Sequence, residues 1–269
     1  MRLIKNAVFF INEIYEDKRL LMDLSIKDLQ KRFSGTYLGL LWGVLQPTMT
    51  IIVYWFAFQF GFRSGDVGEV PFVLWFITGM IYWLFISEAF SNASSSFLEY
   101  NYLIQKVKFN VNILPLVKIL SSYYLHLLFL GIAVVVCMCF GYFPTLYTLQ
   151  VIYYNIAAVI FIFALSLLTS SIMVFFRDLS QVISIVLLIG MWGTPIAWDL
   201  SMFDESVQTV FMANPFYYLI EGYRDAILSR AWFWEKAGLG LYFWGVTVAI
   251  FLIGTSIFTK LRPHFADTV

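Results

Sequence analysis

A short cationic cluster is the clearest candidate for chemistry in this sequence. Lys27, Lys31 and Arg32 precede a break at Ser34 and Gly35, and the two lysines are four positions apart, on one face of a helix. A positive cluster at the level of lipid headgroups can bind an anionic lipid or a diphosphate. The same residues are equally well explained as anchors of the membrane segment that follows. The sequence therefore predicts an anion site, with simple anchoring as the alternative.

Residue patterns typical of catalysis or metal binding do not accompany this cluster. The sequence has no G-x-x-x-x-G-K-[ST] loop, no H-E-x-x-H and no G-x-S-x-G. Cys137 and Cys139 are two positions apart in an apolar run, so they do not face each other on a helix. Among ionisable residues at membrane depth only His126 and Glu88 qualify as candidates. We expect no catalytic site, no metal site and no cofactor in this chain.

The composition excludes an ordinary soluble domain. Of the 269 residues, 61% are hydrophobic and 13% are charged, with a mean hydropathy of +0.80. A soluble domain carries about 25% charged residues. The net charge is zero, which suggests no nucleic acid partner. The composition predicts an all-α integral membrane protein.

Six apolar stretches account for most of the chain. A membrane-spanning helix needs roughly 20 apolar residues. The fifth stretch is short and contains Gly190, Gly193 and Pro195. We expect one domain over 1–269, with interface helices in 1–35, a six-helix region in 36–260 and a tail in 261–269. The expected spans are 38–60, 70–90, 119–140, 149–176, 182–198 and 238–259.

The distribution of Lys and Arg predicts the orientation of these spans. Most basic residues fall in segments on the side of both termini, whereas the acids divide evenly between the two sides. On the opposite side the basic residues are Arg63, Arg224, Arg230 and Lys236. Because Lys and Arg favour the cytoplasmic face, we expect both termini in the cytoplasm.

Two helices are expected before the first span. Residues 1–24 alternate apolar and polar side chains at helical spacing, which is typical of a helix on the membrane surface. Packing on a partner subunit is the alternative. Ser25 followed by Asp28 resembles an N-cap, so a separate short helix is predicted from Ser25 to Phe33, ending at Gly35.

The loop between the second and third spans is amphipathic. Its apolar side chains recur at helical spacing, and a short helix of this kind suits docking into a groove on another protein. A surface helix that only joins two spans is the alternative. The predicted contact residues are Leu98, Glu99, Tyr102, Gln105, Lys106 and Phe109.

The segment between the fifth and sixth spans is predicted to form two short re-entrant helices. It is moderately apolar and is broken at Asn214 and Pro215, since proline ends a helix. Irregular backbone at membrane depth occurs only where protein or a water-filled cavity covers it. We expect an outer gate that includes Pro195, Asn214 and Pro215.

Aromatic residues make up 20% of the chain. Most are explained by the aromatic belts at the two membrane surfaces. A second interpretation is a path for sugars, because aromatic faces stack on sugar rings and tyrosine hydroxyls bond their edges. The candidates for this path are Tyr37, Trp42, Tyr54, Tyr82, Tyr123 and Tyr154.

Four motifs in order resemble the membrane subunits of ABC-2 type exporters for lipid-linked polysaccharides, the O-antigen and wall teichoic acid permeases. The motifs are KRFSGTYLGLLWGVLQP at 31–47, YLIQKVKFNVNILP at 102–115, RDLSQV at 177–182, and TPIAW followed by NPFYYLIEGYRDAIL within 194–228. Many members have proline where this chain has Asn110. The stretches 51–64, 70–75 and 262–267 look more like the teichoic acid branch.

The resemblance implies a half-transporter in the bacterial cytoplasmic membrane. Two copies would form the pathway, and two copies of a separate ABC ATPase, which binds ATP and Mg, would drive it. The substrate would be a polymer on undecaprenyl diphosphate, moved from the cytoplasmic to the outer leaflet. Lys27, Lys31 and Arg32 would receive the diphosphate, and 98–109 would contact the ATPase. The alternatives are an ABC-2 permease for a drug or small lipid, a membrane-embedded transferase, and a scaffold.

Overall fold

The computed structural model describes residues 16–63, 65–104, 110–228 and 230–265, and the regular elements in these ranges are helices. One isolated bridge joins Val67 and Val70. The helices are α2 (Lys18–Phe33), α3 (Leu41–Phe56), α4 (Phe72–Ser94), α5 (Ser96–Glu99), α6 (Asn101–Ile104), α7 (Leu114–Cys139), α8 (Gln150–Met173), α9 (Leu179–Trp192), α10 (Glu205–Met212), α11 (Pro215–Ile227) and α12 (Ala237–Leu261).

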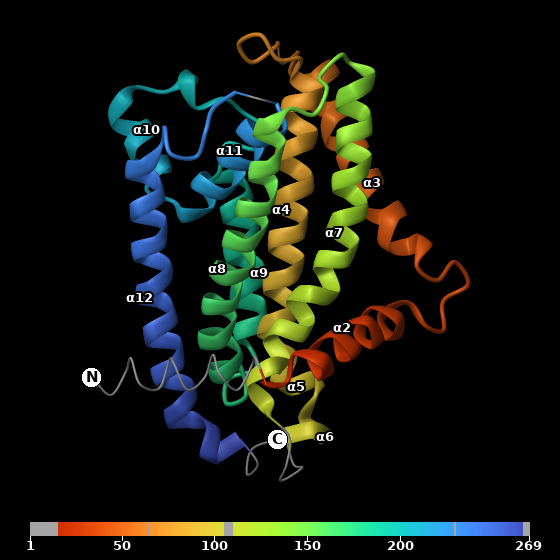
Figure 1. Cartoon of the computed structure of the whole chain (residues 1–269), viewed down its shortest axis with the longest axis vertical. Helices are drawn as coiled ribbons and strands as arrows, with labels where there is room; N and C mark the ends of the chain where they lie inside the picture. Colours follow the sequence, from red (N-terminus) through yellow and green to blue (C-terminus); the bar gives the residue numbers. More distant parts are fainter. Residues whose placement is uncertain (1–15, 64, 105–109, 229, 266–269) are drawn as a thin grey trace.

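The long helices run along the molecule and the short ones lie at its two ends (Figure 1). We call these the α2 end, which also carries α5 and α6, and the α11 end, which also carries α10. Helix α4 is central: most of it is buried, and it packs against α7, α8, α11 and α3. Helix α3 is hardly buried, although it is apolar.

Within the part of the chain that the structure describes, five helical segments are long and apolar enough to cross a membrane, which confirms the prediction of an all-α integral membrane protein. They are Leu41–Gly61, Phe72–Ser94, Val111–Cys139, Leu146–Met173 and Ala237–His264. The fifth predicted span is α9, which has 14 residues and ends at Trp192. Such a helix is about 21 Å long, short of a bilayer core of about 30 Å. The six-span arrangement therefore stays a prediction.

The expected helix start at Ser25 is wrong. Helix α2 is continuous through this position, and Ser25 is completely buried. Its hydroxyl donates to the carbonyl of Met22 at 2.8 Å and shares a hydrogen bond of 3.1 Å with the Tyr124 hydroxyl on α7. A serine in mid-helix can bond a carbonyl of the preceding turn, so its preference for a cap is overridden here by packing against α7. The surface helix expected over 1–24 lies mostly outside the described residues.

The amphipathic loop after α4 is not one helix in the part that the structure describes. It forms two four-residue helices, α5 and α6, separated at Tyr100. Leu98, Glu99 and Tyr102 lie on these turns, whereas Gln105, Lys106 and Phe109 fall outside the described residues. Spacing alone predicted a continuous helix because it carries no information on the break.

Close packing of α11 on α8 generates the first prediction. A Cβ at Gly222 would lie 2.1 Å from the ring of Tyr154, which is buried and has no room to move. We expect Gly222→Ala to lower the free energy of unfolding by about 1–3 kcal/mol through overpacking. Thermal unfolding of the purified protein in detergent measures this loss. Gly245→Ala is the control, because a Cβ there meets nothing within 4 Å. Equal stability of the two variants would contradict the close packing of α11 on α8.

Candidate functional site

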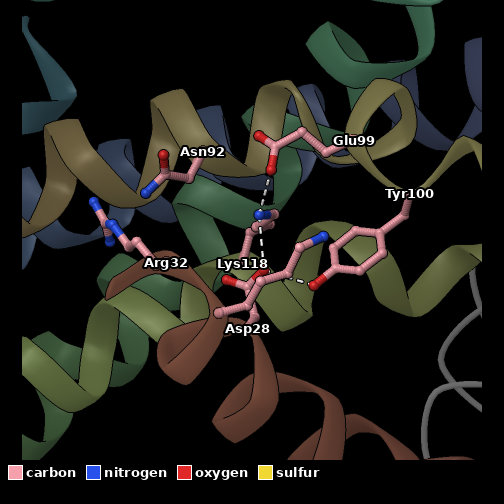
Figure 2. A pocket seen from close by; sticks show the side chains of 7 residues that line it. Asp28, Arg32, Asn92, Glu99, Tyr100 and Lys118 are labelled. Atoms are coloured by element: carbon pink, nitrogen blue, oxygen red, sulfur yellow. Dashed lines mark hydrogen bonds and ion pairs between the residues drawn. The ribbon is translucent and has the colours of Figure 1, made fainter. Parts of the chain in front are cut away.

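A polar cavity of about 200 Å³ lies at the α2 end, between α2, the α4–α5 connection and α7 (Figure 2). The Lys118 ammonium lies between two carboxylates, 2.7 Å from Asp28 on α2 and 2.6 Å from Glu99 on α5. Three elements far apart in sequence therefore meet at one cation. The lining residues are Asp28, Lys31, Arg32, Asn92, Glu99, Tyr100 and Lys118.

Tyr100 closes this cavity on the side of α5. Its hydroxyl donates to the Asp28 carboxylate at 2.6 Å, and its ring lies 5.1 Å from the Lys118 ammonium. Burial, followed by the hydrogen bond to Asp28, raises the pKa of Tyr100 well above its usual value. The phenol therefore remains protonated and keeps donating to Asp28 at any physiological pH.

The three basic residues singled out in the sequence do not converge on one point. Lys27 is exposed on α2 and is not among the residues that line this cavity. Lys31 lines the cavity, with its ammonium 5.9 Å from the ring of Tyr100. Arg32 forms an ion pair with Glu88 on α4. An anion in this cavity would contact Lys31 and would compete with Glu88 for Arg32.

A second cavity, of about 460 Å³, continues from Arg32 along the membrane-spanning region between α3, α4 and α9. Several of its lining side chains are polar. Polar groups at membrane depth face protein or water rather than lipid. The polar lining residues are Arg32, Gln46, Thr50, Ser87, Glu88 and Ser184.

Two of the aromatic candidates line an open groove along α3. Trp42 and Tyr54 border it together with Gln46 and Thr50, and its volume is about 620 Å³. Tyr37 is fully exposed just before α3. These three side chains are therefore available to a ligand beside α3.

The other aromatic candidates lie in or beside the core. Tyr82 and Tyr154 are completely buried, and the Tyr82 hydroxyl donates to the Tyr154 carbonyl at 2.6 Å. The Tyr82 ring stacks on Tyr223 at 3.9 Å. Tyr123 is half-buried beside His126, which bonds Asn155 at 3.2 Å. Tyr82 and Tyr154 are core residues within one copy, which residue type alone could not show. Their place on a sugar path stays a prediction.

At the α11 end the predicted gate residues are close together. The Asn214 amide donates to the carbonyl of Gly193 at 3.2 Å and to the hydroxyl of Thr194 at 3.0 Å. Its oxygen accepts from the Phe216 amide at 3.1 Å and so caps α11, while Pro215 is the first residue of that helix. One side chain therefore ties the end of α9 to the start of α11.

Arg224 is the functional candidate that the sequence analysis missed. It is completely buried and donates to three backbone carbonyls, those of Trp75 at 3.0 Å, Pro195 at 2.6 Å and Ile196 at 2.8 Å. Its guanidinium also lies 3.6 Å from the ring of Trp75. The available signal was an arginine inside an apolar segment, but it was counted only as a loop charge. Arg224 joins α11, α4 and the turn after α9.

Comparison with known proteins places the chain in a family. The model described as ABC-2 type transporter matches residues 20–228. The chain belongs to the ABC-2 type transporter family. It is 28% identical over 250 residues to an O-antigen export system permease protein RfbA of Klebsiella pneumoniae, covering 92% of this chain and 94% of the relative. It is also 28% identical over 261 residues to the RfbA protein of Myxococcus xanthus, covering 96% and 98%.

Membership of the ABC-2 family confirms the resemblance drawn from the four motifs. This ABC-2 protein is a multi-pass membrane protein, and its relatives are transport subunits rather than enzymes. The residues that line both cavities and the hydrogen bonds of Asn214 and Arg224 described above lie within the matched residues. The preference for the teichoic acid branch is not confirmed by these relatives, whose names refer to O-antigen export.

The Arg224 contacts generate the second prediction. We expect Arg224→Gln to lower the free energy of unfolding by about 2 kcal/mol or more, because the Pro195 and Ile196 carbonyls lose their donor at about 1–3 kcal/mol each, whereas the Trp75 carbonyl keeps the Thr78 hydroxyl. Arg224→Lys should be intermediate, since a single ammonium cannot reproduce a planar fork of donors. Thermal unfolding in detergent tests both variants against Arg230→Gln, which changes an exposed arginine nearby. Wild-type stability of Arg224→Gln would refute the stabilising role of the Arg224 hydrogen bonds.

Proposed function

We propose that this chain is the membrane subunit of an ATP-driven exporter that moves an undecaprenyl-diphosphate-linked polysaccharide from the cytoplasmic to the outer leaflet. The observation that carries the proposal is the similarity to O-antigen export permeases along nearly the full length of both chains. O-antigen is the favoured polymer for that reason, and wall teichoic acid is the alternative. An ABC-2 permease for a drug or small lipid remains the second candidate.

The transport pathway is proposed to form between two copies of the chain. Helix α3 is hardly buried within one copy, yet it carries Gln46 and Thr50 beside Trp42 and Tyr54 along a groove. The Thr50 hydroxyl donates to the Gln46 carbonyl of its own helix at 3.0 Å, but the Gln46 side-chain amide at membrane depth needs a protein partner or water. A second copy that presents the same face would cover these polar groups with protein. The two copies would then enclose a path with polar and aromatic walls.

The diphosphate is proposed to bind at the mouth of this path. Arg32 lines both the cavity at the α2 end and the cavity along α3, so it lies at the junction of the two cavities. Lys31 lies beside it, facing the first cavity. Lys27 is exposed and fits the anchoring role at the lipid headgroups.

A separate ABC ATPase, in two copies, is proposed to bind at the α2 end, which would be the cytoplasmic side. Family membership supports such a partner. Tyr102 is exposed on α6 and Glu99 is about half exposed on α5, so both are available for contact. ATP and Mg would be held by that partner, and both termini of this chain would be cytoplasmic.

Isolation of the complex tests the function directly. We expect the tagged chain, extracted from native membranes in mild detergent, to carry a P-loop ATPase at a ratio of one to one. Native mass spectrometry should give a mass equal to two copies of each subunit. Recovery of the chain without any ATPase in several detergents would contradict the exporter and would favour the transferase or scaffold interpretations.

Charge reversal tests the diphosphate site. We expect the double change Lys31→Glu and Arg32→Glu to reduce export at least about tenfold, because two attractive contacts with the phosphates become repulsive. ATPase association should stay intact in the same preparation. The control is Arg19→Glu, which reverses an exposed charge earlier on α2. Normal export by the double variant would exclude these residues as the diphosphate site.

A further inference from the structure

We infer that Lys118 is a shared cation that couples α5 to the membrane-spanning bundle, and that its bond to Glu99 opens and closes during the transport cycle. The inference rests on the proposed contact between α5 and an ATPase. It assigns a positioning role to a buried lysine on α7 that neither the motifs nor the comparisons single out.

The two bonds of Lys118 differ in their surroundings. Asp28 and Lys118 are both nearly buried, with side-chain exposures of 7% and 10%, whereas the Glu99 side chain is 49% exposed. Breaking a buried ion pair leaves an uncompensated charge in a medium of low polarity, which is strongly unfavourable. The Glu99 pair is exposed on the carboxylate side, so it is weaker than the Asp28 pair and is screened by salt. The Asp28 bond is therefore permanent, and the Glu99 bond is the one that can open.

Glu99 has other partners available when it leaves Lys118. Its second carboxylate oxygen accepts from the Ser95 hydroxyl at 2.6 Å, within the same turn of α5. The exposed half of the side chain is free to be solvated. Lys118 keeps Asp28 after the separation, so neither charge is left buried alone. Opening this bond therefore carries no large electrostatic penalty.

Tyr100 provides a pivot for the movement. It follows Glu99 directly at the end of α5, and its hydroxyl stays bonded to Asp28 at 2.6 Å. A displacement of α5 can thus rotate Glu99 away from Lys118, while the adjacent residue Tyr100 keeps the chain attached to α2. Since Lys118 belongs to the second turn of α7, which is long enough to span the membrane, the state of α5 is transmitted to a spanning helix.

The experiment compares Glu99→Gln with Asp23→Asn, which neutralises an exposed acid on α2. Each variant is purified with its ATPase subunit and reconstituted in vesicles, and ATP hydrolysis and polymer export are measured together. Export is divided by the ATP hydrolysed in the same vesicles, and we expect Glu99→Gln to lose about two- to fivefold in polymer exported per ATP, the range that matches an exposed ion pair. Asp23→Asn should match the wild type.

Salt provides a readout that a merely structural role would not change. Screening weakens the exposed bond, so export per ATP by the wild type should fall as salt rises from about 0.05 M to about 0.5 M. Glu99→Gln should show no such dependence, and Lys118→Arg, which keeps both ion pairs, should behave like the wild type.

Three results would overturn the inference: wild-type coupling in Glu99→Gln, identical salt dependence in Glu99→Gln and the wild type, or loss of the ATPase subunit from Glu99→Gln. A wild-type complex without hydrolysis or export would instead refute the proposed function itself, so the two failures are distinguishable.

Discussion

The need to satisfy polar groups away from water is the constraint on which this structure depends. Within the bilayer there is no solvent to bond a carbonyl or a charge, so protein must do so. Arg224 meets this constraint by bonding the carbonyls of Pro195 and Ile196, where the turn after α9 interrupts the helical pattern, and it also bonds the carbonyl of Trp75 on α4. Asn214 does the same for the ends of α9 and α11. Irregular backbone can persist at the α11 end because these two side chains replace the missing helical bonds.

Helix α4 connects the two polar ends of the molecule. Near its start, the carbonyl of Trp75 accepts from Arg224. Near its other end, Glu88 pairs with Arg32 on α2 and accepts from Ser122 on α7 at 3.1 Å. Between these points α4 is the most buried of the spanning helices. Helix α4 contacts Arg224 near its start and carries the Glu88 ion pair near its other end. It therefore links the proposed ATPase side to the proposed outer gate.

The surface of α3 has the opposite character, and this contrast supports transport. A helix that faced only lipid would need no polar side chains, yet α3 contributes Gln46 and Thr50 to the groove at its side. Arg32, at the mouth of the neighbouring cavity, pairs with Glu88. An arginine whose partner can be exchanged, beside a pathway that a second copy would complete, fits the proposed export of a lipid-linked anionic substrate.

The sequence by itself determined the class, the family and most of the spans, because hydrophobic length, charge asymmetry and ordered motifs are local properties. It also placed a break between two short helices at Asn214 and Pro215, since the constraint that proline puts on the backbone is local. Only the tertiary structure decided which polar groups meet. Ser25 became a buried mid-helix residue because α7 packs on it, and Tyr82 proved to be core because burial depends on neighbours distant in sequence. The Lys118 ion pairs joined α2, α5 and α7 for the same reason: no spacing rule encodes contacts between residues far apart along the chain.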